Sequence, residues 1–224
     1  MSGAFTAAGW NFEGLEHGFA PQETAVAQDL HLVRVRQVHG AELIVADAQT
    51  ASPAGDADGL LTRSPGVAVA IATADCVPVL LAAPKARVVA AVHAGWRGSL
   101  AGIVPRAVAE FVTRFGVDVA EMQAALGPSI GGCCYEVDRA IAEQFVDQYG
   151  TEMWTAWTIG RTGKGRLDLR TVNEILLRRT GLTPDSIQHV GPCTSCGGAD
   201  LASYRVQGAD AGRQLSWIGL RAAS

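Results

Sequence analysis

Three runs of apolar residues form the most regular pattern in the chain. The first lies between Gly66 and Thr73, the second runs from Val77 to Ala82, and the third from Arg87 to Val92. Short apolar runs bounded by turn residues are typical of buried strands. Only the stretch from Ala83 to Ala86, which includes Pro84, separates the second run from the third. This spacing predicts a β-hairpin.

Apolar residues recur at helical spacing after the third run and predict a helix from Ser99 to Phe115. Pro105 lies inside this stretch and is expected to kink the helix or to mark its true start, while Gly116 is expected to end it. Asp168 is placed to cap a later helix. The further predicted elements are the helices Asp138–Tyr149 and Leu169–Thr180 and the strands His31–Val38, Leu43–Ala46, Met122–Leu126 and Leu215–Leu220.

Cys76 and His93 lie at the open end of the predicted hairpin. The midpoint between the two positions falls between Pro84 and Lys85, so a hairpin centred there places Cys76 directly opposite His93. Directly opposed residues have Cα atoms roughly 4.5–5.5 Å apart. A thiolate and an imidazole at that separation can bind one metal ion or can form a nucleophile–base pair.

His39 supplies a third candidate ligand, because it ends the predicted strand His31–Val38. Two histidines and one cysteine with an open fourth position are typical of a catalytic zinc site, whereas structural zinc sites usually have four protein ligands. In the alternative interpretation, His39 caps a loop and Cys76 is an ordinary buried thiol.

Composition and charge narrow the classes of function. The 224 residues are 48% hydrophobic and carry a formal net charge of −4, so we expect neither nucleic-acid binding nor a polybasic membrane anchor. Asp75 and Pro78 interrupt the apolar stretch from Val67 to Ala83, which argues against a membrane span. The first ten residues lack the features of a signal peptide, and the odd number of five cysteines argues against a disulfide framework. Without a linker or a composition shift, we expect one domain, residues 1–224, in a reducing cytoplasm.

The remaining cysteines fall in two pairs. Cys133 and Cys134 are adjacent and are expected to point different ways, so at most one of them could join a shared site. Cys193 and Cys196 form a C-x-x-C motif without a second pair at zinc-ribbon spacing. We interpret this motif as a loop with two thiols that does not bind a metal.

Other loops carry polar groups that could reach the same site. Asp58 lies in a glycine-flanked turn and is a candidate to face the site, and the glycine-dense loop from Gly127 to Val137 could cradle a phosphate or a sugar. The side chains of Tyr204, Arg205 and Arg213 could close over it.

These residues together resemble the laccase-domain proteins, which were long labelled multicopper polyphenol oxidases and later described as purine nucleoside phosphorylases. The segment between Phe19 and Gln37 is shorter than in that family and lacks its Arg/Gly-rich stretch, and Val206 stands where a second arginine is expected. The matching motifs are Gln37-Val-His-Gly40, Asp58-Gly59, Ala74-Asp-Cys-Val-Pro-Val79, His93-Ala-Gly-Trp-Arg-Gly98, Gly127-Pro-Ser-Ile-Gly131 with Tyr135-Glu136, Leu167-Asp-Leu169, Pro192-Cys-Thr194 and Ser203-Tyr-Arg205.

The resemblance implies an α/β (α+β) fold with mixed β-sheets packed between helices. It also implies a zinc ion held by His39, Cys76 and His93. The implied activity is phosphorolysis of adenosine, inosine or 5′-methylthioadenosine with phosphate as co-substrate, together with adenosine deamination. We expect a monomer or a homodimer.

Roles for individual residues follow from this hypothesis. Asp75 and Asp58 are the candidate acids that move protons, and Arg97 with the backbone amides of Gly95 and Trp96 is the candidate anion site. Gln37, Ser129 and Tyr135 are the further candidates for substrate binding. Three alternatives stay open: a copper-dependent polyphenol oxidase, a Cys–His amidase acting on a cell-wall precursor, and a metal-binding partner protein without catalytic activity.

Overall fold

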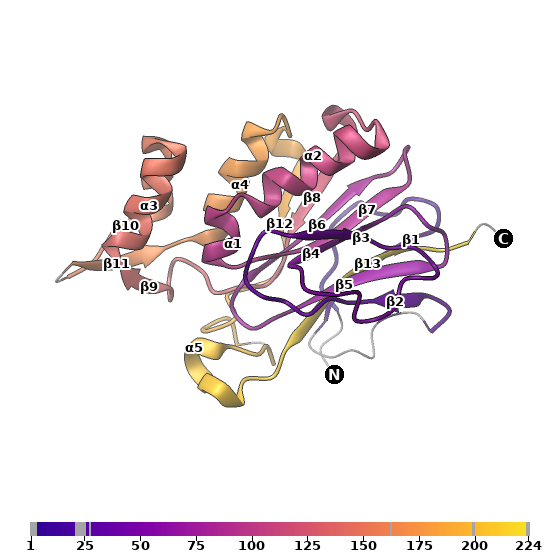
Figure 1. Cartoon of the computed structure of the whole chain (residues 1–224). Coiled ribbons are helices and arrows are strands. Elements are labelled where there is room, and N and C mark those ends of the chain that lie inside the picture. Colours follow the sequence, from indigo (N-terminus) through magenta and orange to yellow (C-terminus); the bar gives the residue numbers. More distant parts are fainter. Residues whose placement is uncertain (1–3, 21–25, 27, 162, 199, 223–224) are drawn as a thin grey trace.

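Two stacked β-sheets and a layer of helices form the body of the computed structural model (Figure 1), which describes residues 4–20, 26, 28–161, 163–198 and 200–222. The larger sheet is mixed and has the strand order β12-β8-β6-β7-β4-β3. Its strands are β12 (Ile187–His189), β8 (Gln123–Leu126), β6 (Val77–Ala83), β7 (Val88–Ala94), β4 (Gly59–Thr62) and β3 (Leu43–Val45).

A second sheet covers one face of the larger sheet, with the order β1-β13-β5-β2. Both faces of β6 and β7 are therefore buried: Val79 and Val92 face the helices, whereas Leu80 and Ala91 face the second sheet. This double burial explains why these strands are apolar without alternation. The strands of the second sheet are β1 (Leu15–Ala20), β13 (Gln214–Leu220), β5 (Val67–Thr73) and β2 (His31–Val33).

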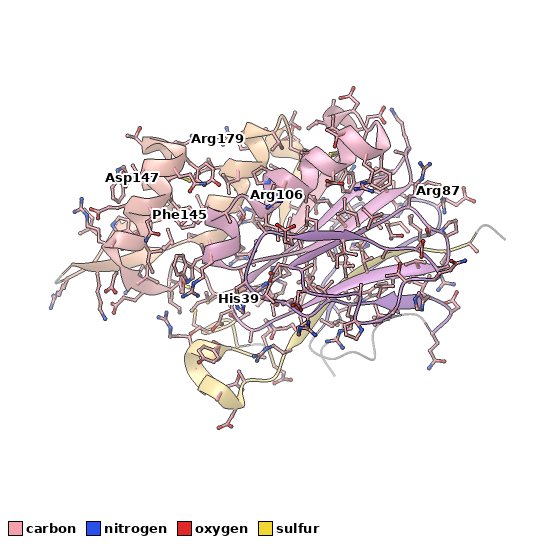
Figure 2. The ribbon with its side chains drawn as sticks, in the orientation of Figure 1. His39, Arg87, Arg106, Phe145, Asp147 and Arg179 are labelled. Carbon is pink, nitrogen blue, oxygen red and sulfur yellow. The ribbon has the colours of Figure 1, made fainter. Side chains whose placement is uncertain are left out.

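Helices cover the other face of the larger sheet (Figure 1). On α3 the apolar Phe145 is buried while Asp147 two positions later is exposed (Figure 2), as an amphipathic helix requires. The helices of this layer are α1 (Trp96–Leu100), α2 (Ile103–Phe115), α3 (Arg139–Tyr149) and α4 (Leu169–Arg179). The short helix α5 (Tyr204–Gln207) lies apart from them (Figure 1). A small third sheet contains β10 (Trp157–Ile159), β11 (Lys164–Leu167) and β9 (Glu136–Asp138), and 3-10 turns occupy Val119–Glu121, Thr151–Ala156, Pro184–Ser186 and Gly208–Asp210.

The α/β class with mixed sheets is confirmed, but the predicted helix Ser99–Phe115 is divided into α1 and α2. Gly102 separates them in the left-handed conformation, with φ = 77°. Pro105 is the third residue of α2, where a missing N–H breaks no intrahelical bond, so it marks the start of this helix. Gly116 ends α2, and the Asp168 side chain caps α4, as predicted.

The predicted strand His31–Val38 is too long, because β2 ends at Val33. Beyond the end of β2, the side chain of Gln37 makes two hydrogen bonds to the backbone of β5. Its amide NH₂ donates to the carbonyl of Ala72, and its amide oxygen accepts from the N–H of Ala72, both at 2.8 Å. Among the described residues, no helix has the length and apolar character needed to cross a membrane.

Candidate active site and metal centre

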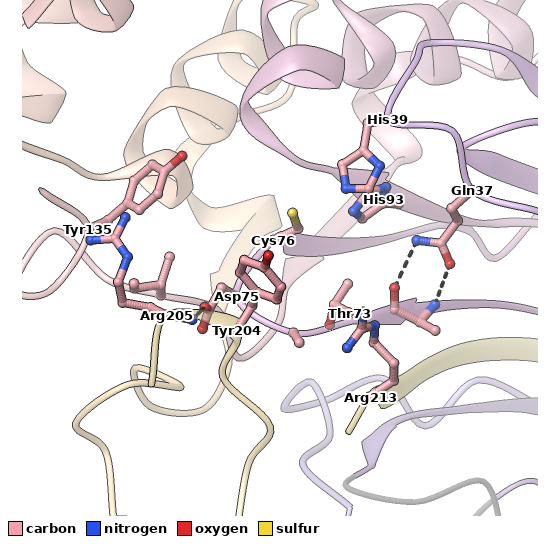
Figure 3. A pocket seen from close by; sticks show the side chains of 13 residues that line it. Gln37, His39, Thr73, Asp75, Cys76, His93, Tyr135, Tyr204, Arg205 and Arg213 are labelled. Atoms are coloured by element: carbon pink, nitrogen blue, oxygen red, sulfur yellow. Dashed lines mark hydrogen bonds between the residues drawn. The ribbon is translucent and has the colours of Figure 1, made fainter. Parts of the chain in front are cut away.

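Three donor side chains from separate parts of the chain meet at one end of the larger sheet (Figure 3). His39 lies in the loop before β3, Cys76 precedes β6, and His93 is the penultimate residue of β7. One donor atom from each residue lies within 4.8 Å of the other two. The trio expected from the sequence is therefore assembled in the folded chain.

The hairpin between β6 and β7 has a different register from the one predicted. His93 pairs with Pro78, and Cys76 lies just beyond Val77, which pairs with Ala94. The turn is centred one residue later than expected, since Ala83 pairs with Val88. Cys76 and His93 still share a face, because Cys76 is two residues from the partner of His93 and side chains alternate along a strand.

Because Gly95 has no side chain, the three donor side chains have room to approach one another beside it. A Cβ atom at this position would lie 3.0 Å from Sγ of Cys76 and 3.7 Å from Nε2 of His93. His39 reaches the same space from a left-handed backbone conformation, with φ = 60°, which is uncommon for a residue other than glycine. Such strained positions concentrate at functional sites.

Asp58 fixes the orientation of His93. The Nδ1–H of His93 donates to Oδ1 of Asp58 at 2.7 Å, so Nε2 is the atom that faces Cys76 and His39. The same carboxylate accepts the N–H groups of Val38, His39 and Gly40 at 3.2, 2.9 and 2.6 Å. Burial raises the pKa of Asp58, but these hydrogen bonds outweigh burial and lower it below its ordinary value.

Without a metal ion, the trio contains an ion pair. Burial raises the pKa of Cys76, but hydrogen bonds from His39 and His93 dominate and lower it to about 6. Burial lowers the pKa of His93, but hydrogen bonds to Asp58 and Cys76 raise it to about 9. A thiolate therefore faces an imidazolium between these two pH values.

The trio forms part of the wall of a cavity of about 580 Å³. This volume falls within the range of roughly 300–1,000 Å³ that is typical of small-molecule sites. The lining residues are Gln37, His39, Ala72, Thr73, Ala74, Asp75, Cys76, His93, Ile130, Tyr135, Tyr204, Arg205 and Arg213.

Asp75 lines this cavity, but both of its carboxylate oxygens already accept hydrogen bonds. The hydroxyl of Thr194 and the backbone N–H of Arg205 donate to them, each at 2.6 Å. Asp75 adopts φ = 87°, which turns the chain sharply just before Cys76. Its carboxylate thus connects Thr194 and the backbone of Arg205 to the turn that precedes Cys76.

Tyr135 presents a phenol to the cavity. Desolvation and the nearby Cys76 raise its pKa to about 12, so the hydroxyl stays protonated and can donate a hydrogen bond. Gln37 also lines the cavity, but its amide is engaged with the backbone of Ala72.

The arginines at the cavity differ from the one chosen from the sequence. Arg205 and Arg213 line it, and in Figure 3 they approach from the C-terminal segment. Arg97 is exposed and stacks over the ring of Trp96 at 4.5 Å, outside the lining.

Three other residues that the sequence predicted for the site do not line the cavity. Asp58 is fully buried behind His93, Trp96 is in α1, and Ser129 is buried. Gly95 contacts the trio without lining the cavity. Thr194 was not singled out from the sequence, although it belongs to the Pro192-Cys-Thr194 motif.

The donor set fits a catalytic metal ion. One thiolate and two imidazole nitrogens are ligands that zinc accepts, and three protein ligands leave a fourth position for substrate or water. The hydrogen bond from Nδ1–H of His93 to Asp58 is the outer support that metal-binding histidines usually have.

The other three histidines have separate partners. Nε2 of His17 accepts the N–H of Ala7, His31 contacts the carbonyl of Thr50, and His189 pairs with Glu174. The described residues therefore provide one cluster that contains histidine, with two imidazoles in it. This count offers no support for a centre of several copper ions, which needs more imidazole ligands.

Comparison with known proteins identifies the family. The model of the family described as "Multi-copper polyphenol oxidoreductase laccase" matches residues 20–221. The chain belongs to this family. The resemblance expected from the sequence motifs is thereby confirmed.

Named relatives of this laccase-domain chain are enzymes. A "Purine nucleoside phosphorylase" from Deinococcus radiodurans is 38% identical over 187 residues, which cover 84% of this chain and 69% of that protein. An "Adenosine deaminase RL5" from an unknown prokaryotic organism is 35% identical over 196 residues, covering 84% of this chain and 74% of that protein. The crystal structure of YlmD from Geobacillus stearothermophilus superposes with a TM-score of 0.87 at 27% identity, covering 99% of this chain and 98% of that chain.

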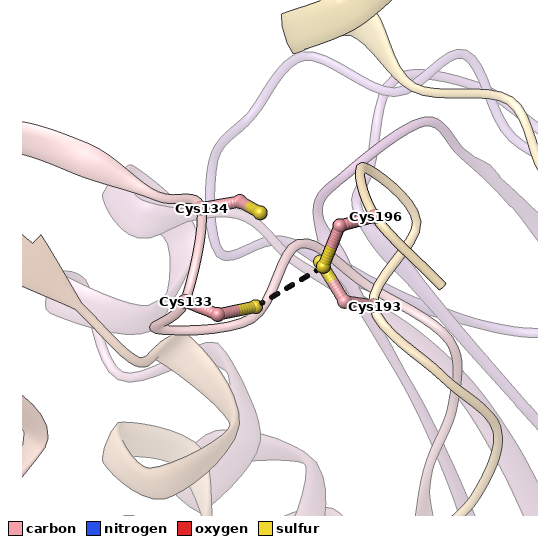
Figure 4. A group of neighbouring side chains, drawn as sticks. All are labelled: Cys133, Cys134, Cys193 and Cys196. Atoms are coloured by element: carbon pink, nitrogen blue, oxygen red, sulfur yellow. Dashed lines mark hydrogen bonds between the residues drawn. The ribbon is translucent and has the colours of Figure 1, made fainter. Parts of the chain in front are cut away.

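A second cluster, which the sequence did not predict, contains the other four cysteines (Figure 4). The prediction that Cys133 and Cys134 point apart is wrong. Alternation applies to extended strands, whereas these residues lie in a turn in which the N–H groups of Cys134 and Tyr135 both donate to the carbonyl of Gly131. The sequence has no second pair at zinc-ribbon spacing, but the fold places the adjacent Cys133 and Cys134 beside the C-x-x-C motif.

Proposed function

We propose that this protein is a zinc-dependent purine nucleoside phosphorylase that acts on adenosine, inosine and 5′-methylthioadenosine and also deaminates adenosine. One observation carries the proposal: a single cavity of about 580 Å³ has a three-donor metal site on its wall and two arginines at its rim. The names of the relatives, purine nucleoside phosphorylase and adenosine deaminase, support the same activities.

Arg205 and Arg213 are suited to phosphate. Both side chains are exposed at the cavity, so they can pair with an anion, and charge-assisted bonds from guanidinium groups are among the strongest available. Arg213 donates to the backbone carbonyls of Ala211 and Gly212, which hold it at the base of β13. We therefore assign anion capture to Arg213 and Arg205 in place of Arg97.

The part of the cavity wall formed by Tyr135, beside Arg205, is suited to the purine. The neutral phenol of Tyr135 can donate a hydrogen bond to a purine nitrogen as electrons move onto the leaving base. A bound metal ion would supply a Lewis acid at His39, Cys76 and His93. Asp75 holds Thr194 and the Arg205 backbone in place, so we assign it a positioning role.

Zinc is the metal that we propose, because one cysteine and two histidines with an open fourth position match its catalytic sites. Copper is the alternative ion for the same donors. The free state of all five cysteines supports a reducing compartment, and we propose the cytoplasm.

A second candidate function rests on the arrangement of Asp58, His93 and Cys76. Without metal, Asp58 orients His93 and His93 faces a thiol whose pKa is about 6. A nucleophile, a base and an orienting acid in this order are typical of a cysteine hydrolase, such as an amidase on a cell-wall precursor. A metal ion would occupy the thiolate, so this activity would increase when the metal is removed.

The test follows adenosine, inosine and 5′-methylthioadenosine by chromatography, with phosphate present or omitted, using zinc-loaded, copper-loaded and Cys76→Ser protein. We expect free base only with phosphate and metal, and inosine from adenosine without phosphate. No turnover of any nucleoside at full zinc occupancy would favour the hydrolase, which the metal-free protein would then reveal on amide substrates.

A further inference from the structure

Cys133, Cys134, Cys193 and Cys196 form a compact group outside the cavity lining. The four sulfur atoms lie within 4.8 Å of one another, and Sγ of Cys133 is 3.5 Å from Sγ of Cys196. A zinc ion bonded to four thiolates at about 2.3 Å holds its sulfur atoms about 3.8 Å apart. The sulfur–sulfur distances, 3.5 Å for Cys133 and Cys196 and at most 4.8 Å for any pair, therefore include the distance expected for a tetrahedral tetrathiolate site.

The fold brings the two cysteine pairs together. β8 and β12 are parallel neighbours, so the loops that follow them leave the same end of the sheet. The two loops continue side by side, because Ser129 and Cys193 form a parallel β-bridge. In this bridge the N–H of Thr194 donates to the carbonyl of Ser129 at 3.0 Å. Residues 60 or so positions apart in the chain thus become neighbours by topology rather than by sequence spacing.

The backbone around the sulfurs is arranged as in a metal-binding turn. The N–H of Gly131 donates to Sγ of Cys193 at 3.2 Å, which stabilises a thiolate there. The N–H of Gly197 donates to the carbonyl of Cys193 at 2.8 Å and closes the C-x-x-C turn. A Cβ at Gly197 would lie 2.4 Å from that carbonyl, so the turn requires glycine. Gly197 and Gly198, which follow the motif, favour a tight chelating turn over a helix at this position.

We propose that these four cysteines bind one zinc ion at a second, structural site. Four protein ligands leave no open position, which distinguishes this site from the one at His39, Cys76 and His93. No common ligand joins the two sites, so each can lose its ion without the other.

A zinc ion at this site would hold in place the part of the cavity wall that contains Tyr135. Tyr135 directly follows Cys134, and Thr194 directly follows Cys193 and donates to Asp75. The guanidinium of Arg205 donates to the carbonyl of Cys134 at 3.4 Å and lies 5.3 Å from the ring centre of Tyr135. The proposed site therefore connects the Tyr135 loop to the segment that contains Arg205.

The test measures metal content by elemental analysis of the full chain, made with zinc, without added copper, and purified under a reductant without oxygen. We expect about two zinc ions in the unaltered protein and about one in the Cys133→Ser/Cys196→Ser double variant. Cys76→Ser should also hold about one, and the control Ser195→Ala, which alters the same turn without removing a ligand, should hold about two.

A second measurement does not depend on whether the variants fold. Unaltered protein loaded with ¹¹³Cd should give two NMR resonances, one in the tetrathiolate region and one from the mixed nitrogen and sulfur site. A single resonance with one metal per chain would overturn the proposal, as would a disulfide among the four cysteines in the reduced preparation. Iron in place of zinc at these cysteines would overturn the choice of metal.

Discussion

Nδ1 of His93 lies 2.7 Å from Oδ1 of Asp58, and both side chains are shielded from solvent. The hydrogen bond leaves Nε2 of His93 as the only ring nitrogen free for a metal. The same carboxylate holds the backbone of the loop that carries His39. One acid thus positions two of the three proposed ligands, although it does not touch the cavity.

Asp58→Asn should weaken metal binding about 10–100-fold, because the orienting partner of a ligand histidine is altered. An asparagine NH₂ facing the N–H of Gly40 or Val38 should also cost about 1–3 kcal/mol of folding stability. Competition with a fluorescent chelator and thermal unfolding measure the two effects. The control is Asp56→Asn, which alters an exposed acid paired with Arg36 and should leave the metal affinity unchanged. Equal affinities in the two variants would contradict the positioning role of Asp58.

Gly95→Ala should lower metal occupancy at the first site, because its methyl group would lie 3.0 Å from Sγ of Cys76, which is closer than an ordinary van der Waals contact. Gly66→Ala is the matched control: nothing lies within 4 Å of its Cβ, but φ is 77°, so it should lose about 1–2 kcal/mol of stability without losing metal. Elemental analysis beside thermal unfolding separates the two outcomes. Normal metal content in Gly95→Ala would mean that the ion does not bind between these donors.

Metal affinity at this site should increase with pH. Without metal, the pKa of Cys76 is about 6 and that of His93 about 9, so between these values the ion must displace a proton from His93. The apparent affinity should therefore increase about tenfold per pH unit in this range and level off above it. Below the lower value, protonation of Cys76 should make the dependence steeper.

Isothermal titration in buffers of different ionisation enthalpy measures the protons released. Release of about one proton from His93 per ion near pH 8 agrees with the ion-pair description. Affinity that is independent of pH between the two pKa values would contradict it.

Arg213→Ala should raise the KM for phosphate about 10–100-fold, since a charge-assisted bond to an anion contributes roughly 1.5–3 kcal/mol. Arg97→Ala, the control, should change this KM little, because Arg97 stacks on Trp96 outside the cavity lining. Initial rates at varied phosphate with saturating inosine provide the comparison. A large effect of Arg97→Ala with none from Arg213→Ala would restore the assignment made from the sequence.

The local features of the fold were predictable because they depend on neighbours in the chain. The apolar runs gave the buried strands, Gly116 ended α2, and Asp168 capped α4. The break between α1 and α2 was harder to predict from the sequence, since Gly102 is one residue in an otherwise helical pattern. The hairpin register depends on the conformation of the turn, and Arg87 adopts φ = 50° there, which apolar periodicity does not reveal.

Contacts between distant segments were the part of the site that the sequence could not provide. The sequence predicts that Asp58 faces the site, but its position behind His93 follows from the pairing of β4 with β7. Cys133 and Cys134 meet the C-x-x-C motif only because β8 and β12 are parallel neighbours. Arg213 reaches the cavity because β13 pairs with β5, which ends just before Asp75 and Cys76.

The most direct test of the proposed function is the product formed from inosine and phosphate by zinc-loaded protein. ³¹P NMR should show ribose 1-phosphate appearing in step with hypoxanthine, and Cys76→Ser, which lacks a ligand, should form neither. Hypoxanthine released with free ribose, at a rate independent of phosphate, would contradict phosphorolysis. No hypoxanthine from protein whose first metal site is fully occupied would contradict the proposed function as a whole.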